Sequence, residues 1–185
     1  MTMKRKILIL SVLAICIATL AAGTLAYYNA ETTAHNVITT GSVQIAVQEW
    51  ANTEKTEVFT DKTGVMPGAA VTKIAEVKNT GKGDAWVRVK IEKAIQLAGD
   101  GEVDPGLVKL DIDTTHWTAK DGYYYYNVAL KAGEVTAPIF TKVTFDANMG
   151  NAYQNATATV DVTAQAVQAA NNGKTVTEAA GWPNA

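Results

Sequence analysis

Two histidines are the residues in this chain best suited to bind a transition metal. They are His35 and His116, separated by eighty residues, and neither lies in a His-Glu-x-x-His pattern. Zinc peptidases commonly hold their ion with two histidines four residues apart on a helix and a glutamate between them. We therefore predict no catalytic residue and no zinc site, and we expect both histidines to serve exposed polar roles.

Carboxylates offer a second kind of metal chemistry. Asp111 and Asp113 share one face of a predicted strand, and Asp100, Glu102 and Asp104 crowd one loop. Hard carboxylate oxygens suit calcium, but the loop lacks the full spacing of a calcium-binding loop. We expect no cofactor and solvated acids here, with calcium as the alternative.

Four consecutive tyrosines, residues 123–126, are the most distinctive aromatic stretch. In a strand they send two rings to each face, so one pair enters the core and the other pair is left for solvent or a partner. Exposed aromatic rings stack on sugars or fill protein interfaces. We predict that Tyr124 and Tyr126 form an assembly or binding surface; the alternative is an ordinary aromatic strand.

The N-terminal residues have the pattern of a secretory signal peptide. Lys4, Arg5 and Lys6 precede an apolar run at residues 7–22, and small residues follow it. We expect cleavage after Ala26. The alternative is a retained membrane anchor, but sixteen helical residues reach only about 24 Å, short of a hydrocarbon core of about 30 Å. We therefore expect contact with a membrane only through the uncleaved signal peptide.

Cleavage there leaves 159 residues beginning at Tyr27, with Cys16 removed. The leader holds three of the sixteen basic residues and none of the eighteen acids, so the mature net charge is thirteen minus eighteen, or −5. An acidic chain is a poor partner for nucleic acid. With no cysteine, the predicted mature chain has neither a disulfide nor a thiolate metal site.

Short alternating segments separated by turns predict an all-β fold, an antiparallel β-sandwich of jelly-roll type. Helix is predicted only as one short piece near residues 92–97. The second hairpin is predicted between residues 123–130 and 138–145. The predicted strands are residues 42–50, 71–78, 87–91, 107–112, 123–130, 138–145 and 157–165. The predicted domains are 1–26 signal peptide, 27–41 exposed N-terminal arm, 42–170 β-sandwich and 171–185 C-terminal tail.

Several of these stretches resemble one group of exported proteins. Gly-Thr-Leu-Ala-Tyr-Tyr at residues 23–28 and Ile-Thr-Thr-Gly-Ser-Val-Gln-Ile at residues 38–45 are similar to the processing region of SipW-dependent proteins of Gram-positive bacteria. That group includes the camelysin and TasA-type biofilm-matrix proteins. Further similar stretches are residues 66–71, 78–81, 86–89, 121–126, 133–136 and 139–140.

The resemblance implies a SipW-type signal peptidase as a partner during export, and a secreted protein of the extracellular matrix or cell surface. We expect a structural subunit of a homo-oligomeric fibre, with other matrix proteins as further partners. Its arm, headed by Tyr27 and Tyr28, is expected to add to a strand edge. One alternative that the resemblance implies is a camelysin-type secreted metalloendopeptidase, whose activity is assigned to no residue here. A second alternative is an extracellular carbohydrate- or wall-binding module that uses the tyrosine face.

Overall fold

The computed structural model describes residues 38–39, 43–60, 67–98, 101–150, 153 and 155–183. The chain divides into two compact units, residues 1–34 and 35–185, and every described residue belongs to the second. The predicted signal peptide and most of the predicted arm, including Tyr27 and Tyr28, lie outside the described residues. Among the described residues, no helix is long and apolar enough to cross a membrane.

The described part of the chain is all-β, as predicted, and helix occurs in it only as short 3-10 pieces. Alternation of apolar and polar residues accounts for the strands, because it gives each strand one side to bury. The elements are β1 (Ile38–Thr39), β2 (Ile45–Trp50), β3 (Ala70–Asn79), β4 (Ala85–Gln96), η1 (Pro105–Leu107), β5 (Val108–Leu110), β6 (Trp117–Lys120), β7 (Tyr123–Tyr126), β8 (Phe140–Phe145) and β9 (Thr157–Gln168).

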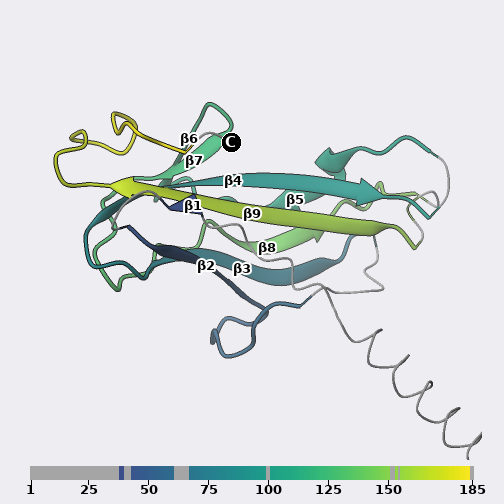
Figure 1. The fold of residues 1–185 in the computed structure, drawn as a ribbon. Coiled ribbons are helices and arrows are strands. Elements are labelled where there is room, and N and C mark those ends of the chain that lie inside the picture. The colour runs from purple at the N-terminus through teal and green to yellow at the C-terminus, as the bar shows by residue number, and fades with distance from the viewer. Residues whose placement is uncertain are drawn as a thin grey trace, which may run out of the picture. The chain divides into compact units, whose positions relative to one another are not determined.

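These strands form two sheets that face each other (Figure 1). The five-stranded sheet has the order β1-β9-β4-β7-β6, and the four-stranded sheet has the order β2-β3-β8-β5. Every pairing between named strands is antiparallel except that of β1 with β9, which is parallel. The fold is therefore consistent with the predicted β-sandwich.

The longest ladder joins β4 to β9 over twelve consecutive residue pairs. Its inner face carries small and branched apolar side chains opposite one another, such as Val87 with Ala166 and Val89 with Ala164, all fully buried. The four-stranded sheet supplies the opposing layer of the same core, including Val77 and Phe140. Burial of these side chains is the main favourable contribution to folding.

Two local predictions were wrong. The short helix expected near residues 92–97 is instead the second half of β4, because the β9 partners keep this stretch extended. The expected second hairpin is absent: β7 ends at Tyr126, and β8 pairs with β3 and β5. The intervening segment crosses between the sheets. Its Leu130 forms an isolated β-bridge with Ala85, and its Val135 forms another with Lys78.

Asn79 holds this crossing in place. Its side chain is fully buried at the end of β3, and its amide donates to the carbonyls of Gly83, at 2.8 Å, and Leu130, at 2.9 Å. Its side-chain oxygen accepts from the Gly81 N–H at 2.9 Å. One side chain thus connects the β3–β4 turn to the crossing segment.

We predict that Asn79→Ala lowers the free energy of unfolding by about 2–3 kcal/mol, because it leaves buried backbone groups without their partner. Urea denaturation of the purified domain measures this loss. The control is Asn127→Ala, which removes an exposed amide bonded to Thr115 and Thr118 and should cost less than about 1 kcal/mol. Equal losses in the two variants would contradict the assignment.

Candidate functional site

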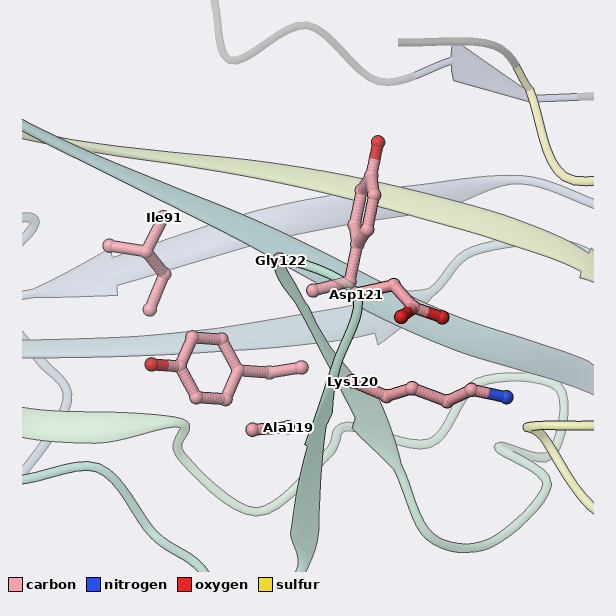
Figure 2. A pocket seen from close by; sticks show the side chains of 7 residues that line it. Ile91, Ala119, Lys120, Asp121 and Gly122 are labelled. Atoms are coloured by element: carbon pink, nitrogen blue, oxygen red, sulfur yellow. The ribbon is translucent and has the colours of Figure 1, made fainter.

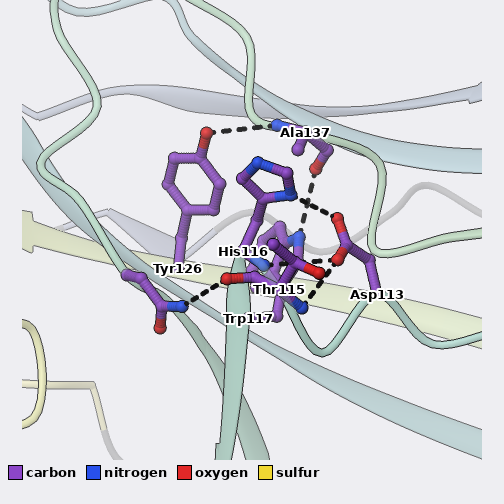
Figure 3. A network of polar contacts seen from close by, with 7 residues as sticks. Asp113, Thr115, His116, Trp117, Tyr126 and Ala137 are labelled. Carbon is purple, nitrogen blue, oxygen red and sulfur yellow. Dashed lines mark hydrogen bonds and ion pairs between the residues drawn. The ribbon is translucent and has the colours of Figure 1, made fainter.

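The four tyrosines make up β7, which forms a hairpin with β6 (Figure 1). Asp121 and Gly122 form its two-residue turn with φ values of 50° and 79°, the left-handed conformations that tight hairpins require. Tyr126 faces the core, where its ring centroid lies 5.0 Å from that of Trp117. Its hydroxyl accepts a hydrogen bond from the Ala137 N–H, as Figure 3 shows.

This placement corrects the predicted surface role of Tyr126. Tyr126 is 9% exposed and belongs to the main core cluster, and Tyr124 is half-buried against the same cluster. The outward pair is instead Tyr123 and Tyr125. The sequence correctly indicates two rings on each face, but the period of two cannot say which face meets the second sheet.

The outward pair surrounds an arginine. The guanidinium carbon of Arg88, on β4, lies 3.9 Å from the ring centroid of Tyr123 and 4.7 Å from that of Trp182. Its Nε donates to the side chain of Gln165 at 2.8 Å. An arginine held between aromatic faces makes favourable cation–π contacts and is largely removed from water.

Trp182 belongs to the segment that follows β9, which folds back onto this outer face. Val176 is only 3% exposed, and the Trp86 indole donates to the Asn172 carbonyl at 2.8 Å. Trp182 itself packs edge-on against Tyr125. In Figure 1 the yellow C-terminal segment leaves the end of β9 and returns beside β6 and β7. The predicted tail is therefore a packed cover over much of its length, and it occupies the outer tyrosine face.

An open pocket of about 350 Å³ remains at the tip of the hairpin (Figure 2). Lys120 and Asp121 extend on one side of the hairpin, away from Ile91. Such a depression, with an apolar wall and a carboxylate and ammonium at its rim, has the groups that bind a sugar ring. It is lined by Ile91, Ala119, Lys120, Asp121, Gly122, Tyr123 and Tyr124.

His116 has a local partner. Its Nδ1 lies 2.6 Å from Oδ2 of Asp113, and the other oxygen of Asp113 accepts the N–H groups of Thr115 and His116 (Figure 3). The hydrogen bond from the His116 ring is the main reason that the pKa of Asp113 lies below its ordinary value. This pair closes the turn before β6. His35 lies outside the described residues.

Asp104 and Asp111, which we also considered for calcium, have structural partners, whereas Glu102 is exposed. Asp104 caps η1 by accepting the Gly106 N–H at 2.8 Å. Asp111 accepts from the Thr141 N–H at 2.9 Å, the Lys142 N–H at 2.7 Å and the Thr141 hydroxyl at 2.5 Å. Within the described ranges, no group of three histidine, cysteine or acidic residues is arranged to hold a metal ion. Asp100 lies outside those ranges.

Four strands lie at the ends of the two sheets: β1 and β6 in one, β2 and β5 in the other. β1 covers only the end of its neighbour, pairing Ile38 with Gln165 and Thr39 with Ala166. The rest of that side of β9, from Thr157 to Ala164, has no paired strand within the described ranges. A long edge of this kind can accept another strand through backbone hydrogen bonds.

Comparison of the chain with family models, with curated proteins and with solved structures gives no match.

We predict that Asp111→Asn weakens the domain most at neutral pH. Burial raises the pKa of Asp111, but hydrogen bonds from Thr141 and Lys142 outweigh it and hold the pKa below its ordinary value of 3.8. A carboxyl group whose pKa is lower in the folded state stabilises the fold at pH values above its unfolded pKa. This contribution is lost as the pH falls through its folded pKa. The variant's thermal midpoint should lie about 2–4 °C below wild type at pH 7, and the difference should shrink as the pH falls below 3.8. Thermal melts at pH 7 and at a series of pH values below 3.8 measure this change. Asp161→Asn, which changes an exposed carboxylate, is the control; a pH-independent difference for Asp111→Asn would contradict the assignment.

Proposed function

We propose that this chain is an exported structural protein, a subunit of a biofilm-matrix or cell-surface fibre that assembles by association of strand edges. The observation that carries the proposal is the edge of β9. Only the two residues of β1 pair with it among the described residues, although β9 is twelve residues long.

The hydrogen-bonding direction along β9 supports this reading. The Ala169 N–H donates to the Asp84 carbonyl. This bond shows that the backbone N–H and C=O groups of the odd-numbered residues of β9 point toward β4. In an extended strand the backbone groups alternate between the two edges. The N–H and C=O groups of Ala158 and Val162 therefore point to the side without a strand partner in the described part of the chain.

The predicted arm fits such an edge. Residues 27–40 contain β-branched Thr32, Thr33, Val37 and Ile38 and no proline. A strand added to a sheet edge gains main-chain hydrogen bonds with little demand on sequence. Because β1 belongs to the sandwich, the eleven residues before it can reach roughly 36 Å from it, at about 3.3 Å per residue. Export and removal of the signal peptide would free it for the next subunit. No described site favours the metalloendopeptidase alternative.

We predict that a chain starting at Asn36 forms no fibres under conditions in which the chain starting at Tyr27 does. The shorter chain keeps the whole described sandwich, so it should show the same β-type circular dichroism and melt cooperatively. Negative-stain microscopy at rising concentration is the measurement. The control is a full-length arm with Thr33→Pro, which removes a backbone donor and should also form no fibres. Fibres formed by the chain starting at Asn36 would contradict the proposal.

The pocket at the hairpin tip supports a second candidate function, binding of a wall carbohydrate. We predict that Tyr124→Ala and Asp121→Asn each weaken binding to purified wall polysaccharide about tenfold, since they remove a stacking ring and a charged acceptor. Asparagine tolerates the left-handed turn position, so Asp121→Asn keeps the hairpin. Asp161→Asn is the matched control. Saturable binding that neither pocket variant changes would exclude this site.

A further inference from the structure

One asparagine fastens the C-terminal cover, residues 169–183, which is the yellow segment that follows β9 in Figure 1. The side-chain oxygen of Asn172 accepts from the Ala180 N–H at 2.9 Å, and its side-chain nitrogen donates to the Ala180 carbonyl at 3.0 Å. The backbone carbonyl of Asn172 accepts from the Trp86 indole at 2.8 Å. Asn172 therefore closes the loop of the cover and also joins it to β4.

The structure requires glycine at the next position. Gly173 has a φ of 76°, the left-handed conformation that glycine adopts without steric cost. A Cβ added here would lie 3.0 Å from the backbone nitrogen of Ala179 and 3.1 Å from the carbonyl oxygen of Thr175, closer than ordinary van der Waals contact. Both are backbone atoms, so relief needs the turn itself to shift. The conformation of the cover therefore selects the dipeptide Asn-Gly at residues 172–173.

An asparagine followed by glycine is prone to deamidation. The backbone nitrogen of Gly173 attacks the side-chain amide carbon of Asn172 and forms a C–N bond, while the amide nitrogen takes up the displaced proton and leaves as ammonia. Water then opens the resulting succinimide ring at one of its two carbonyls, which gives aspartate or isoaspartate. Glycine favours ring closure because it has no side chain beside the attacking nitrogen. Solvent supplies the only co-reactant, and no oxidant or enzyme is needed.

The cover can open without disturbing the main core. Its buried side chain, Val176, lies in a small cluster with Trp86 and Tyr125 that is separate from the main core cluster. Trp182 packs at the edge of the same small cluster, and residues 169–183 form turns rather than strand or helix. Local opening of such a segment costs less free energy than global unfolding. We therefore expect a small fraction of folded molecules to have an open cover.

The closed cover restrains the reaction. Ring closure requires the side-chain amide of Asn172 to turn toward the nitrogen of Gly173, and the two bonds to Ala180 fix the orientation of that amide. Gly173 is exposed, so water reaches this turn. We therefore expect Asn172 to react chiefly in molecules whose cover is open.

We propose that Asn172 is a deamidation site whose conversion unfastens the C-terminal cover irreversibly and uncovers the outer face of β4, β7 and β9. Aspartate at this position loses the donor for the Ala180 carbonyl and places a negative charge beside that oxygen. Isoaspartate also lengthens the main chain by one carbon, which displaces the groups that Trp86 and Ala180 bind. The uncovered face presents Arg88 and Tyr125, which the cover otherwise contacts. This site goes beyond the proposed function, because it depends on neither a strand edge nor the hairpin pocket.

The first test measures the rate of modification at Asn172. The chain starting at Tyr27 and a synthetic peptide of residues 168–177 are incubated at mildly alkaline pH, and peptide mapping by mass spectrometry follows aspartate and isoaspartate at each asparagine. Asn172 should convert several-fold more slowly in the folded chain than in the peptide, because the closed cover holds its amide. Asn171, which is exposed and followed by asparagine, is the internal control and should convert much more slowly than Asn172 in both samples.

Trp182→Ala tests whether opening of the cover controls this rate. The variant removes the ring that packs against Tyr125 and Arg88, and it leaves the main core cluster intact. Its Asn172 should convert several-fold faster than that of the unmodified chain, because the cover is open in a larger fraction of molecules. An unchanged rate in Trp182→Ala, or no conversion at Asn172 in either folded chain, would overturn the proposal.

The second test asks whether the product releases the cover. Asn172→Asp reproduces the aspartate product. Asn171→Asp is the matched control, because it adds the same charge at the neighbouring exposed position, whose φ of 58° aspartate tolerates. Trypsin cuts after Lys174 once the surrounding chain unfolds locally, so cleavage there should be several-fold faster in Asn172→Asp alone. Both variants should keep the β-type circular dichroism of the unmodified chain. Equal cleavage rates in the two variants, or loss of the β-type signal in Asn172→Asp, would contradict the assignment of Asn172 as the fastening residue.

Discussion

The twelve-pair ladder between β4 and β9 is the constraint on which the other features of the domain depend. Because its hydrogen bonds fix both the register and the direction of every side chain, one face of the pair becomes core and the other becomes available for Arg88 and Gln165. The ladder also decides which backbone groups of β9 point outward. The open edge and the arginine cluster are thus two consequences of one pairing.

The two sheets are joined by polar contacts as well as by apolar packing. Asn79 connects the β3–β4 turn to the crossing segment, and two lysines each reach a carbonyl of the opposite sheet. A buried lysine contributes favourably only when its charge is matched, and Glu49 and Phe59 provide that match for Lys73. Polar groups at the sides of this sandwich therefore join its two sheets alongside the apolar core.

Much of the strand pattern could be predicted from alternation, including the strands predicted at residues 71–78 and 157–165, although β6 was not predicted. Pairing of distant strands could not, because hydrophobic period says which side is buried but not which strand lies next to it. That is why β8 was assigned to β7 when it pairs with β3 and β5. The same limit explains the tyrosines: the pattern gives two pairs, and only the sheet order shows that Tyr126 lies inside. Lys73 gave no sequence signal, since a lysine in a strand is ordinarily on the exposed face.

The four tryptophans occupy three regions of the domain, with Trp86 and Trp182 in the same outer cluster. Trp117 is core, Trp50 donates to the Glu76 carboxylate, Trp86 donates to Asn172, and Trp182 packs against Tyr125 and Arg88. Indole emission depends on the polarity and mobility of the surroundings, so the rings are built-in optical probes of these three regions. A chain that keeps a single tryptophan would report on the core, the β2 end or the C-terminal cover without any added label.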